Sequence, residues 1–353
     1  MLKMELEAKY REYKRKQILK ISGMALIVVM VALICLTYGT ESNLVSGFRA
    51  IINYAVGNGF CEEAAAVDKV LVFLRLPRIC LAIMAGIGLA VSGLMMQSVT
   101  RNFLVSPFTL GVSSAAAFGA SLCIVFGSAT IFLKDAFIIG SAFLSSLLSI
   151  LVVFVVVNRI GITANSIILV GIALNYFFSA MTASLQFFAQ ENKLAAVVQW
   201  TFGTFNRANW HAVIVIGFVI AIGCIVASQF FLKWNAMASG DDEMVKSLGL
   251  SPERLRAQTM FLSVLITATV ISFTGVIGFV GLIAPHMARM LVGSDHTYLF
   301  PMTAGLGAVL LLTADAIGKF ALYPVNVPVG IVVSFIGVPI FINLILKTRK
   351  SGL

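Results

Sequence analysis

Residues 272–293, SFTGVIGFVGLIAPHMARMLVG, decide the fold of this chain, because they place helix breakers and charged residues inside an apolar run. The exceptional residues of this stretch are three glycines, a proline, a histidine and an arginine: Gly275, Gly278, Gly281, Pro285, His286 and Arg289. In hydrocarbon each unsatisfied backbone group costs several kcal/mol, so such a run persists only where protein or a water-lined cavity satisfies it. We therefore expect the stretch to lie inside a bundle of membrane helices.

The spacing of the glycines and the proline predicts two short helices that meet at a turn. Glycines that recur every three residues let another backbone approach closely, and Pro285 removes one hydrogen bond and ends or bends the helix before it. Tight helix packing alone is the alternative for any single glycine. For His286 we favour a structural hydrogen bond over catalysis or metal binding.

The composition identifies a polytopic, all-α membrane protein. Only 11% of the residues are charged, and the mean hydropathy is +1.00, whereas an ordinary soluble domain carries about 25% charged residues. A membrane span takes roughly 20 apolar residues. We predict ten spans: residues 18–38, 79–98, 107–126, 136–157, 166–188, 210–232, 257–272, the stretch quoted above, 302–322 and 331–346. No soluble domain fits between them, so residues 1–353 form a single transmembrane domain.

The net charge of +10 follows the positive-inside rule. Lysines and arginines gather in residues 3–20, at the carboxyl end and in alternate short loops, and not on one amphipathic face. This distribution argues against a nucleic-acid partner. We expect the basic amino terminus, residues 1–17, and the carboxyl terminus to lie in the cytoplasm, next to anionic membrane lipid.

Residues 233–256 form the long polar loop of the second half and are predicted to lie in the cytoplasm. Asp241 or Asp242 can cap a short helix there, Gly249 can end it in the left-handed conformation, and the Ser-Pro-Glu run from Ser251 can start the next helix. A simple hairpin needs only a few residues. The pattern favours a docking element, and a solvated loop is the alternative.

The helix predicted over 166–188 carries four polar residues at steps of four, three and four: Asn175, Ser179, Thr182 and Gln186. This spacing places all four on one helix face. They either bond to neighbouring helices or line a wet pathway, and the residues alone do not decide between the two.

Asp315 is the one acid well inside a predicted span. A carboxylate at the bilayer centre costs at least about 2.5–3.5 kcal/mol, so it needs a partner, and Lys319 lies one turn further along the same face. We expect the pair to reach toward the outer surface. The chain contains no G-x-x-x-x-G-K-[ST] loop for nucleotide phosphates, no HExxH motif and no Cys/His cluster, so no ATPase or metal site of its own is predicted.

The residues GVIGFVGLIAPHMARMLVG resemble the signature of the FecCD-type permeases, which are membrane subunits of ABC importers for iron-siderophores, haem and cobalamin. Residues 75–78, RLPR, followed by AG at 85, SG at 92, Gln97, RN at 101, Pro107 and LG at 110, are similar to the first block of that family. AD at 314, PVG at 328 and GVP at 337 resemble its last block. The resemblance spans about residues 70 to 346.

The resemblance implies a type II importer fold, a cobalamin-permease-like bundle. Its partners would be a second copy or a close paralogue, two ATPases that bind ATP and Mg²⁺, and an extracytoplasmic binding protein, all at a bacterial cytoplasmic membrane. The implied ATPase-coupling residues are Glu243, Lys246, Ser247, Leu248, Gly249, Ser251 and Arg254. Arg75, Arg78 and Lys319 would receive acidic residues of the binding protein, although the last position is more commonly arginine.

The resemblance also favours the pathway for the polar helix face, with Asn165 near its inner mouth. The gate of the family often carries Ser or Thr, so the pair Ala164 and Asn165 departs from the pattern. The alternative function is a proton-coupled secondary transporter that uses Asp315. A membrane-embedded enzyme ranks last, because no nucleophile and base stand together. The substrate chelate cannot be read from the sequence.

Overall fold

The computed structural model describes residues 2–37, 69–127, 131–322 and 325–350, and these ranges contain helices and no strand. The first half consists of α1 (Leu2–Thr37), η1 (Leu71–Arg75), α4 (Leu76–Thr100), η2 (Pro107–Leu110), α5 (Val112–Phe126), α6 (Ile131–Ile160) and α7 (Ala164–Phe188). The second half consists of α8 (Glu191–Thr201), α9 (Trp210–Ser228), α10 (Phe231–Ser239), α11 (Asp242–Ser247), α12 (Pro252–Thr274), α13 (Val280–Val292), α14 (His296–Phe320) and α15 (Val329–Lys350).

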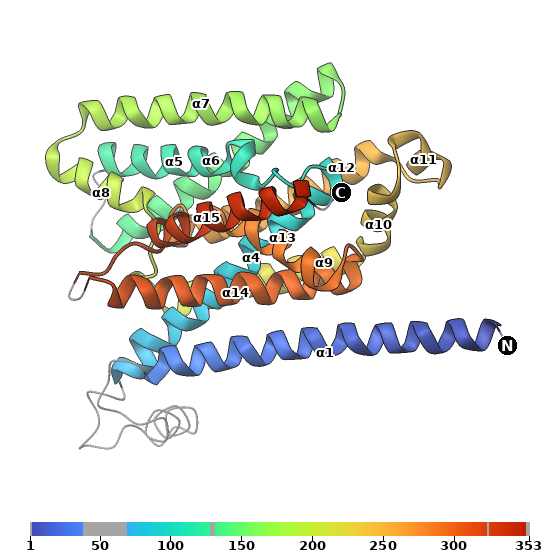
Figure 1. The fold of residues 1–353 in the computed structure, drawn as a ribbon. Helices are drawn as coiled ribbons and strands as arrows, with labels where there is room; N and C mark the ends of the chain where they lie inside the picture. The colour runs from blue at the N-terminus through green and yellow to red at the C-terminus, as the bar shows by residue number, and fades with distance from the viewer. Residues whose placement is uncertain (1, 38–68, 128–130, 323–324, 351–353) are drawn as a thin grey trace.

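The described helices confirm the all-α membrane class. Seven of them are long and apolar enough to cross a membrane by length and composition, and three shorter apolar helices accompany them, at residues 112–126, 280–292 and 329–343. Together they match the ten expected segments in order. The amino end of α1, α10, α11 and the end of α15 lie at one end of the bundle, which we call the α11 end (Figure 1). α8 and the end of α14 lie at the opposite end, the α8 end.

Several boundaries differ from the sequence prediction. The basic tail is helical, since α1 already begins at Leu2. Two exposed ion pairs stabilise this part of the helix, and the two residues of each pair lie one turn apart: Glu5–Lys9 and Glu12–Lys16. The expected polar loop 233–256 is mostly helical, since α10, α11 and the start of α12 fill it. α8 lies in a segment expected to be a connection. Of the connection between the first two expected spans, residues 39–68 lie outside the described residues.

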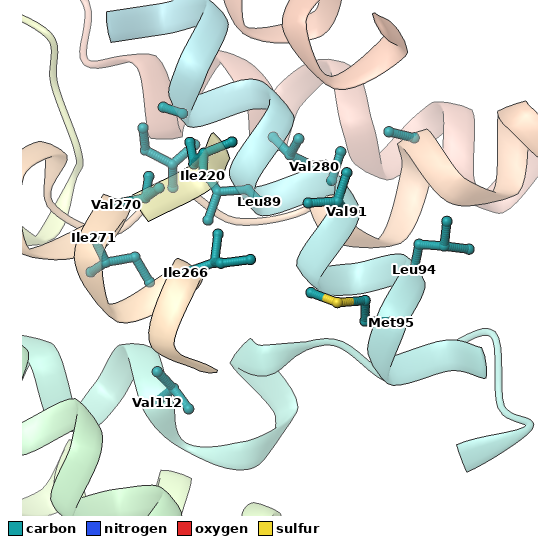
Figure 2. Packing of buried hydrophobic residues seen from close by; sticks show 14 of the residues in the cluster. Leu89, Val91, Leu94, Met95, Val112, Ile220, Ile266, Val270, Ile271 and Val280 are labelled. Carbon is teal, nitrogen blue, oxygen red and sulfur yellow. The ribbon is translucent and has the colours of Figure 1, made fainter. Parts of the chain in front are cut away.

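Helix α4 is the centre of the bundle. It packs against α14, α12, α13 and α9, and nearly every residue from Ala85 to Thr100 is buried. Figure 2 shows Leu89, Val91, Leu94 and Met95 of α4 beside apolar side chains of α9, α12 and α13. Because α4 is apolar on all sides, it can be covered on all sides.

Glycines let α4 approach its neighbours backbone to backbone. A methyl group on Gly93 would overlap the carbonyl oxygen of Gly281 in α13, and one on Gly86 would overlap the carbonyl oxygen of Gly307 in α14. Such contacts between small residues are a common basis of helix association in membranes, where burial of apolar area gives no driving force. Gly281 of the glycine-rich stretch lies at one of these two close approaches.

The break in the glycine-rich stretch lies at residues 275–279 and not at Pro285, which corrects the prediction. α12 ends at Thr274, Gly275 has φ +75°, and Pro285 lies inside α13. Proline leaves the carbonyl four residues earlier without its helix donor. That carbonyl belongs to Gly281, and Gln97 Nε2 of α4 donates a hydrogen bond to it at 3.3 Å. The neighbouring helix thus compensates the proline, so the helix continues.

We expect Gly93→Ala to disrupt the bundle, because its methyl group meets backbone atoms of Gly281 that cannot move aside. Overpacking of a core costs about 1–3 kcal/mol even where side chains can adjust. The control is Gly217→Ala in α9, where an added methyl group has no atom within 4 Å. Thermal unfolding of the detergent-solubilised protein should show a lower midpoint for the first variant and no loss for the second. Equal midpoints would contradict the proposed backbone contact.

Candidate functional site

The helix α11 at the α11 end is capped at both ends, as the sequence predicts. Asp241 Oδ1 accepts a hydrogen bond from the backbone nitrogen of Met244 at 2.9 Å. Gly249 has φ +76° and donates its backbone N–H to the carbonyl of Lys246 at 2.9 Å, which ends the helix. Pro252 then occupies the first turn of α12. Residues 242–251, which we call the docking helix and turn, therefore form an ordered protrusion.

The protrusion exposes all the residues that the sequence nominated for coupling: Glu243, Lys246, Ser247, Leu248, Gly249, Ser251 and the neighbouring Arg254. Val245 is fully buried and anchors the helix, whereas Leu248 is 57% exposed. Lys246 pairs with Glu253 at 3.0 Å on the surface. An exposed leucine among charged residues on a capped helix is a surface that a partner protein can contact.

The sequence did not reveal the charged residues that connect α11 to the rest of the bundle. Asp242 contacts Arg101, which follows α4, and Arg256 in α12, at 2.9 and 2.8 Å. The hydrogen bond from Arg256 holds the pKa of the Asp242 carboxyl below its ordinary value. No local spacing signals these contacts, because Arg101 lies 141 residues before its partner.

At the α8 end, one buried carboxylate joins two cations. Asp315 is 4% exposed. Arg78 of α4 donates to it from Nε at 3.0 Å and from Nη2 at 2.7 Å, and Lys319 Nζ lies 3.0 Å from Oδ2. The predicted pair of Asp315 and Lys319 is present, with Asp315 buried and Lys319 partly exposed at the wall of a cavity. Arg78 reaches Asp315 from the neighbouring helix and satisfies it inside the bundle.

The two cations and Arg75 line a cavity of ≈ 460 Å³. Asn206 and Asn326 contribute amide groups to its wall, and Arg78 Nη1 donates to Asn206 Oδ1 at 2.7 Å. Arg75 Nη1 donates to the carbonyl of Leu36 at 3.3 Å. Since Arg78 and Lys319 share one carboxylate, the cluster keeps an excess of positive charge. The cavity can therefore accept an anionic group.

The polar face of α7 is only partly available. Asn175 and Ser179 are exposed, and Gln186 is partly exposed, whereas Thr182 is buried and donates to the carbonyl of Phe178 in its own helix. Asn165 is exposed in the first turn of α7, at the α11 end. The exposed residues leave a polar strip on the outside of the chain, where another subunit or water can reach it.

Two polar networks lie near the α11 end of α4. Arg289 Nη1 donates to Gln97 Oε1 at 2.6 Å, and its guanidinium lies 4.5 Å from the centre of the Phe103 ring. His286 contacts the same ring edge-on, and no hydrogen bond of its side chain occurs within the described residues, so the hydrogen bond expected there is not found. Gln97 thus joins α4 to α13.

The hydrogen-bonded histidine is His296, at the start of α14. It is 3% exposed, its Nε2 lies 2.6 Å from Ser98 Oγ of α4, and its Nδ1 donates to Asn235 Oδ1 of α10 at 2.6 Å. The network ties α10 to the two helices that also meet at the glycine contacts. Within the described ranges, no three His, Cys, Asp or Glu side chains gather as metal ligands would.

The non-helical residues 275–279 border an apolar groove of ≈ 650 Å³, whose other wall is α15. Gly278 and Phe279 lie in this groove, opposite Phe335. Phe279 has φ +65°, which is uncommon for a residue with a bulky side chain. Gly275 must remain glycine, because a methyl group there would overlap the carbonyl oxygen of Trp200. Mostly apolar residues line this groove. It differs in this respect from the cavity at the α8 end, which we call the cationic cavity because Arg75, Arg78 and Lys319 line it.

Comparison with known proteins agrees with this architecture. The model of the FecCD transport family matches residues 22–347. A putative ABC transporter permease protein of Methanocaldococcus jannaschii is 37% identical over 98% of this chain and 99% of its own length. A probable iron chelatin transport system permease protein of Helicobacter pylori is 32% identical over 94% of this chain and 99% of its own length.

Among solved structures, the chain resembles an inward-facing conformation of a putative metal-chelate type ABC transporter. The TM-score is 0.81 with 31% identity, and the match covers 93% of this chain and 98% of that one. The family resemblance seen in the sequence is therefore confirmed. The chain belongs to the FecCD transport family, and it is a multi-pass membrane permease subunit of the ABC transporter type.

Proposed function

We propose that this chain is the permease subunit of a binding-protein-dependent ABC importer for an iron chelate, either a siderophore or haem, or for cobalamin. Its place is the cytoplasmic membrane, with both termini and α11 on the cytoplasmic side. One observation carries the proposal: opposite ends of a single bundle hold a capped protruding helix and a cationic cavity. The named substrates of the H. pylori relative and of the solved transporter support a metal chelate as the substrate class.

The docking helix and turn, residues 242–251, would contact an ATPase subunit that binds ATP and Mg²⁺. The chain has no phosphate-binding motif of its own, so the energy must come from a partner. Leu248 is the exposed apolar residue best placed to enter a pocket of that partner, with Glu243, Lys246 and Arg254 around it. Apolar anchors surrounded by charged residues are typical of protein interfaces.

The cationic cavity would receive acidic side chains of an extracytoplasmic binding protein. Arg75, Arg78 and Lys319 line it, and the excess positive charge remains because Asp315 balances only one of the two cations it holds. Charge pairs of this kind accelerate the encounter of two proteins and weaken with salt. Asp315 thereby has a structural function, since it fixes the positions of Arg78 and Lys319.

The substrate pathway would form between two copies of the chain, or between the chain and a close paralogue. The polar strip of α7 supports this placement, because Asn175 and Ser179 face outward from the single chain. A polar side chain that faces lipid is costly, so the strip requires either water or a protein partner.

The alternative of a proton-coupled carrier based on Asp315 is not favoured. Arg78 donates to both carboxylate oxygens of Asp315, and Lys319 Nζ lies 3.0 Å from Oδ2. A buried ion pair that loses one partner is strongly destabilised. A transport cycle that released this carboxylate from both cations would disrupt the α8 end of the bundle.

Leu248→Asp should abolish ATP hydrolysis that depends on the binding protein, and substrate uptake, because it places a charge at the proposed apolar anchor. The variant keeps Gly249 and hence the helix end. The measurement is ATP hydrolysis and iron-chelate uptake by the permease reconstituted with its ATPase in liposomes. Leu6→Asp, at an exposed leucine of α1, is the control and should behave as the parent. Normal uptake by the Leu248 variant would refute the docking assignment.

Arg75→Gln combined with Lys319→Gln should slow association with the binding protein at low ionic strength, and high salt should remove most of the difference. Loss of long-range attraction lowers the encounter rate, whereas salt already screens it in the parent. Arg159→Gln combined with Lys233→Gln, two exposed cations at the opposite end of the bundle, is the control for net charge. Association rates from surface-immobilised permease decide the matter, and equal rates at low salt would remove the cavity from the interface.

Cysteines placed at Asn175 and Ser179 should react with a small water-soluble maleimide in a background without native cysteines. A cysteine at the buried Thr182 should react far more slowly, because its side chain is covered within the chain itself. The rates are read from mass shifts of the protein in proteoliposomes. If all three positions are protected with and without ATP, the α7 strip is packed against protein or lipid and does not line the pathway.

A further inference from the structure

The carboxylate of Asp242 joins the docking helix to two arginines of the bundle. Asp242 is the first residue of α11. Its Oδ1 accepts a hydrogen bond from Arg101 Nη1 at 2.9 Å and another from Arg256 Nη2 at 2.8 Å. Its Oδ2 accepts a third from Arg256 Nη1 at 2.8 Å. The contact with Arg256 is thus bidentate, which fixes orientation as well as distance.

Both arginines are themselves held by backbone groups. Arg256 is 3% exposed, and it donates from Nε to the carbonyl of Val99 and from Nη1 to the carbonyl of Ile162, at 3.3 and 3.2 Å. Arg101 has φ +51° and donates from Nε to the carbonyl of Met237 in α10 at 2.6 Å. The carboxylate of Asp242 is therefore connected to the end of α4, to α10, to the start of α12 and to the segment before α7.

The other contacts of α11 connect it less rigidly to the bundle. The pair of Lys246 and Glu253 is exposed at both partners, and such surface pairs contribute about 0–1 kcal/mol. Val245 is buried, but apolar packing has no preferred direction and can slide. Charge-assisted bidentate bonds resist both separation and rotation. The ion cluster is the stiffest of these links between α11 and the bundle.

We propose that Asp242 is the positioning residue through which movement of the docking helix is passed to α4 and α12. The inference rests on the proposed function, since it requires an ATPase that moves α11. Helix α4 continues without a break from this cluster to Arg78, which holds Asp315 of α14 at the other end. A shift of α11 would therefore displace α4, and with it the cationic cavity.

Asp242→Asn tests the inference, because asparagine keeps the size of the side chain and removes its charge. The reporter is a cysteine at Ser179, in the background without native cysteines, in the full complex with the ATPase in proteoliposomes. We expect the parent to show different maleimide reaction rates with and without ATP. In the Asp242 variant the ratio of these two rates should fall to one, while the ATPase still co-purifies with the permease.

Asp241→Asn is the matched control. The two acids are neighbours, but Asp241 caps α11 through its own side chain, and asparagine caps a helix equally well. This control should keep the parental ratio of rates. Arg101→Met should reduce the ratio as Asp242→Asn does, and the double variant should be no worse than the worse single variant, because both changes break one link.

The possible outcomes distinguish failure of the inference about Asp242 from failure of the proposed function. A parental ratio in the Asp242 variant overturns the inference, and so does loss of the ATPase during purification, since Asp242 would then serve attachment and not transmission. If the maleimide reaction rate of the parent does not depend on ATP while the ATPase is bound and active, the proposal that α7 lines the pathway is wrong. In that case the inference falls with it.

Discussion

Helix α4 can occupy the centre of this bundle only because its backbone touches the backbones of two other helices. The contacts occur at Gly93 with Gly281 and at Gly86 with Gly307. In a membrane, close packing and hydrogen bonds must replace the gain from burying apolar area, so the distance between helix axes is decisive. At this distance Gln97 reaches the carbonyl that Pro285 leaves without a donor, and α13 stays helical past its proline.

Among the described residues, the ion pairs between helices lie at the two ends of α4 and not along its middle. Arg78 holds Asp315 at the α8 end, whereas Arg101 and Arg256 hold Asp242 at the α11 end. Each cluster pairs one acid with two bases. Breaking such a pair inside a protein is far more costly than forming it is favourable, because a lone buried charge remains. The clusters therefore fix the geometry of the ends and contribute less to net stability.

The sequence predicted the features that depend on residues close together in the chain. Apolar length gave the ten segments, and the cap residues Asp241 and Gly249 gave α11, since a cap acts within a few residues of its helix. The pair Asp315 and Lys319 was predictable at one helical turn. The break at 275–279 was misplaced because the compensation for Pro285 comes from Gln97, in another helix. Arg78 lies 237 residues from Asp315, and such partners leave no spacing to read.

The contacts of Asp242 with Arg101 and Arg256 also limit which substitutions this chain tolerates. If the acid alone is lost, both guanidinium groups lose their carboxylate partner, and one of them, Arg256, is 3% exposed, so an unpaired buried charge remains. Loss of the acid is therefore compatible with this packing only where the buried arginine is replaced as well. The shared carboxylate thus limits the substitutions that the start of α11 tolerates.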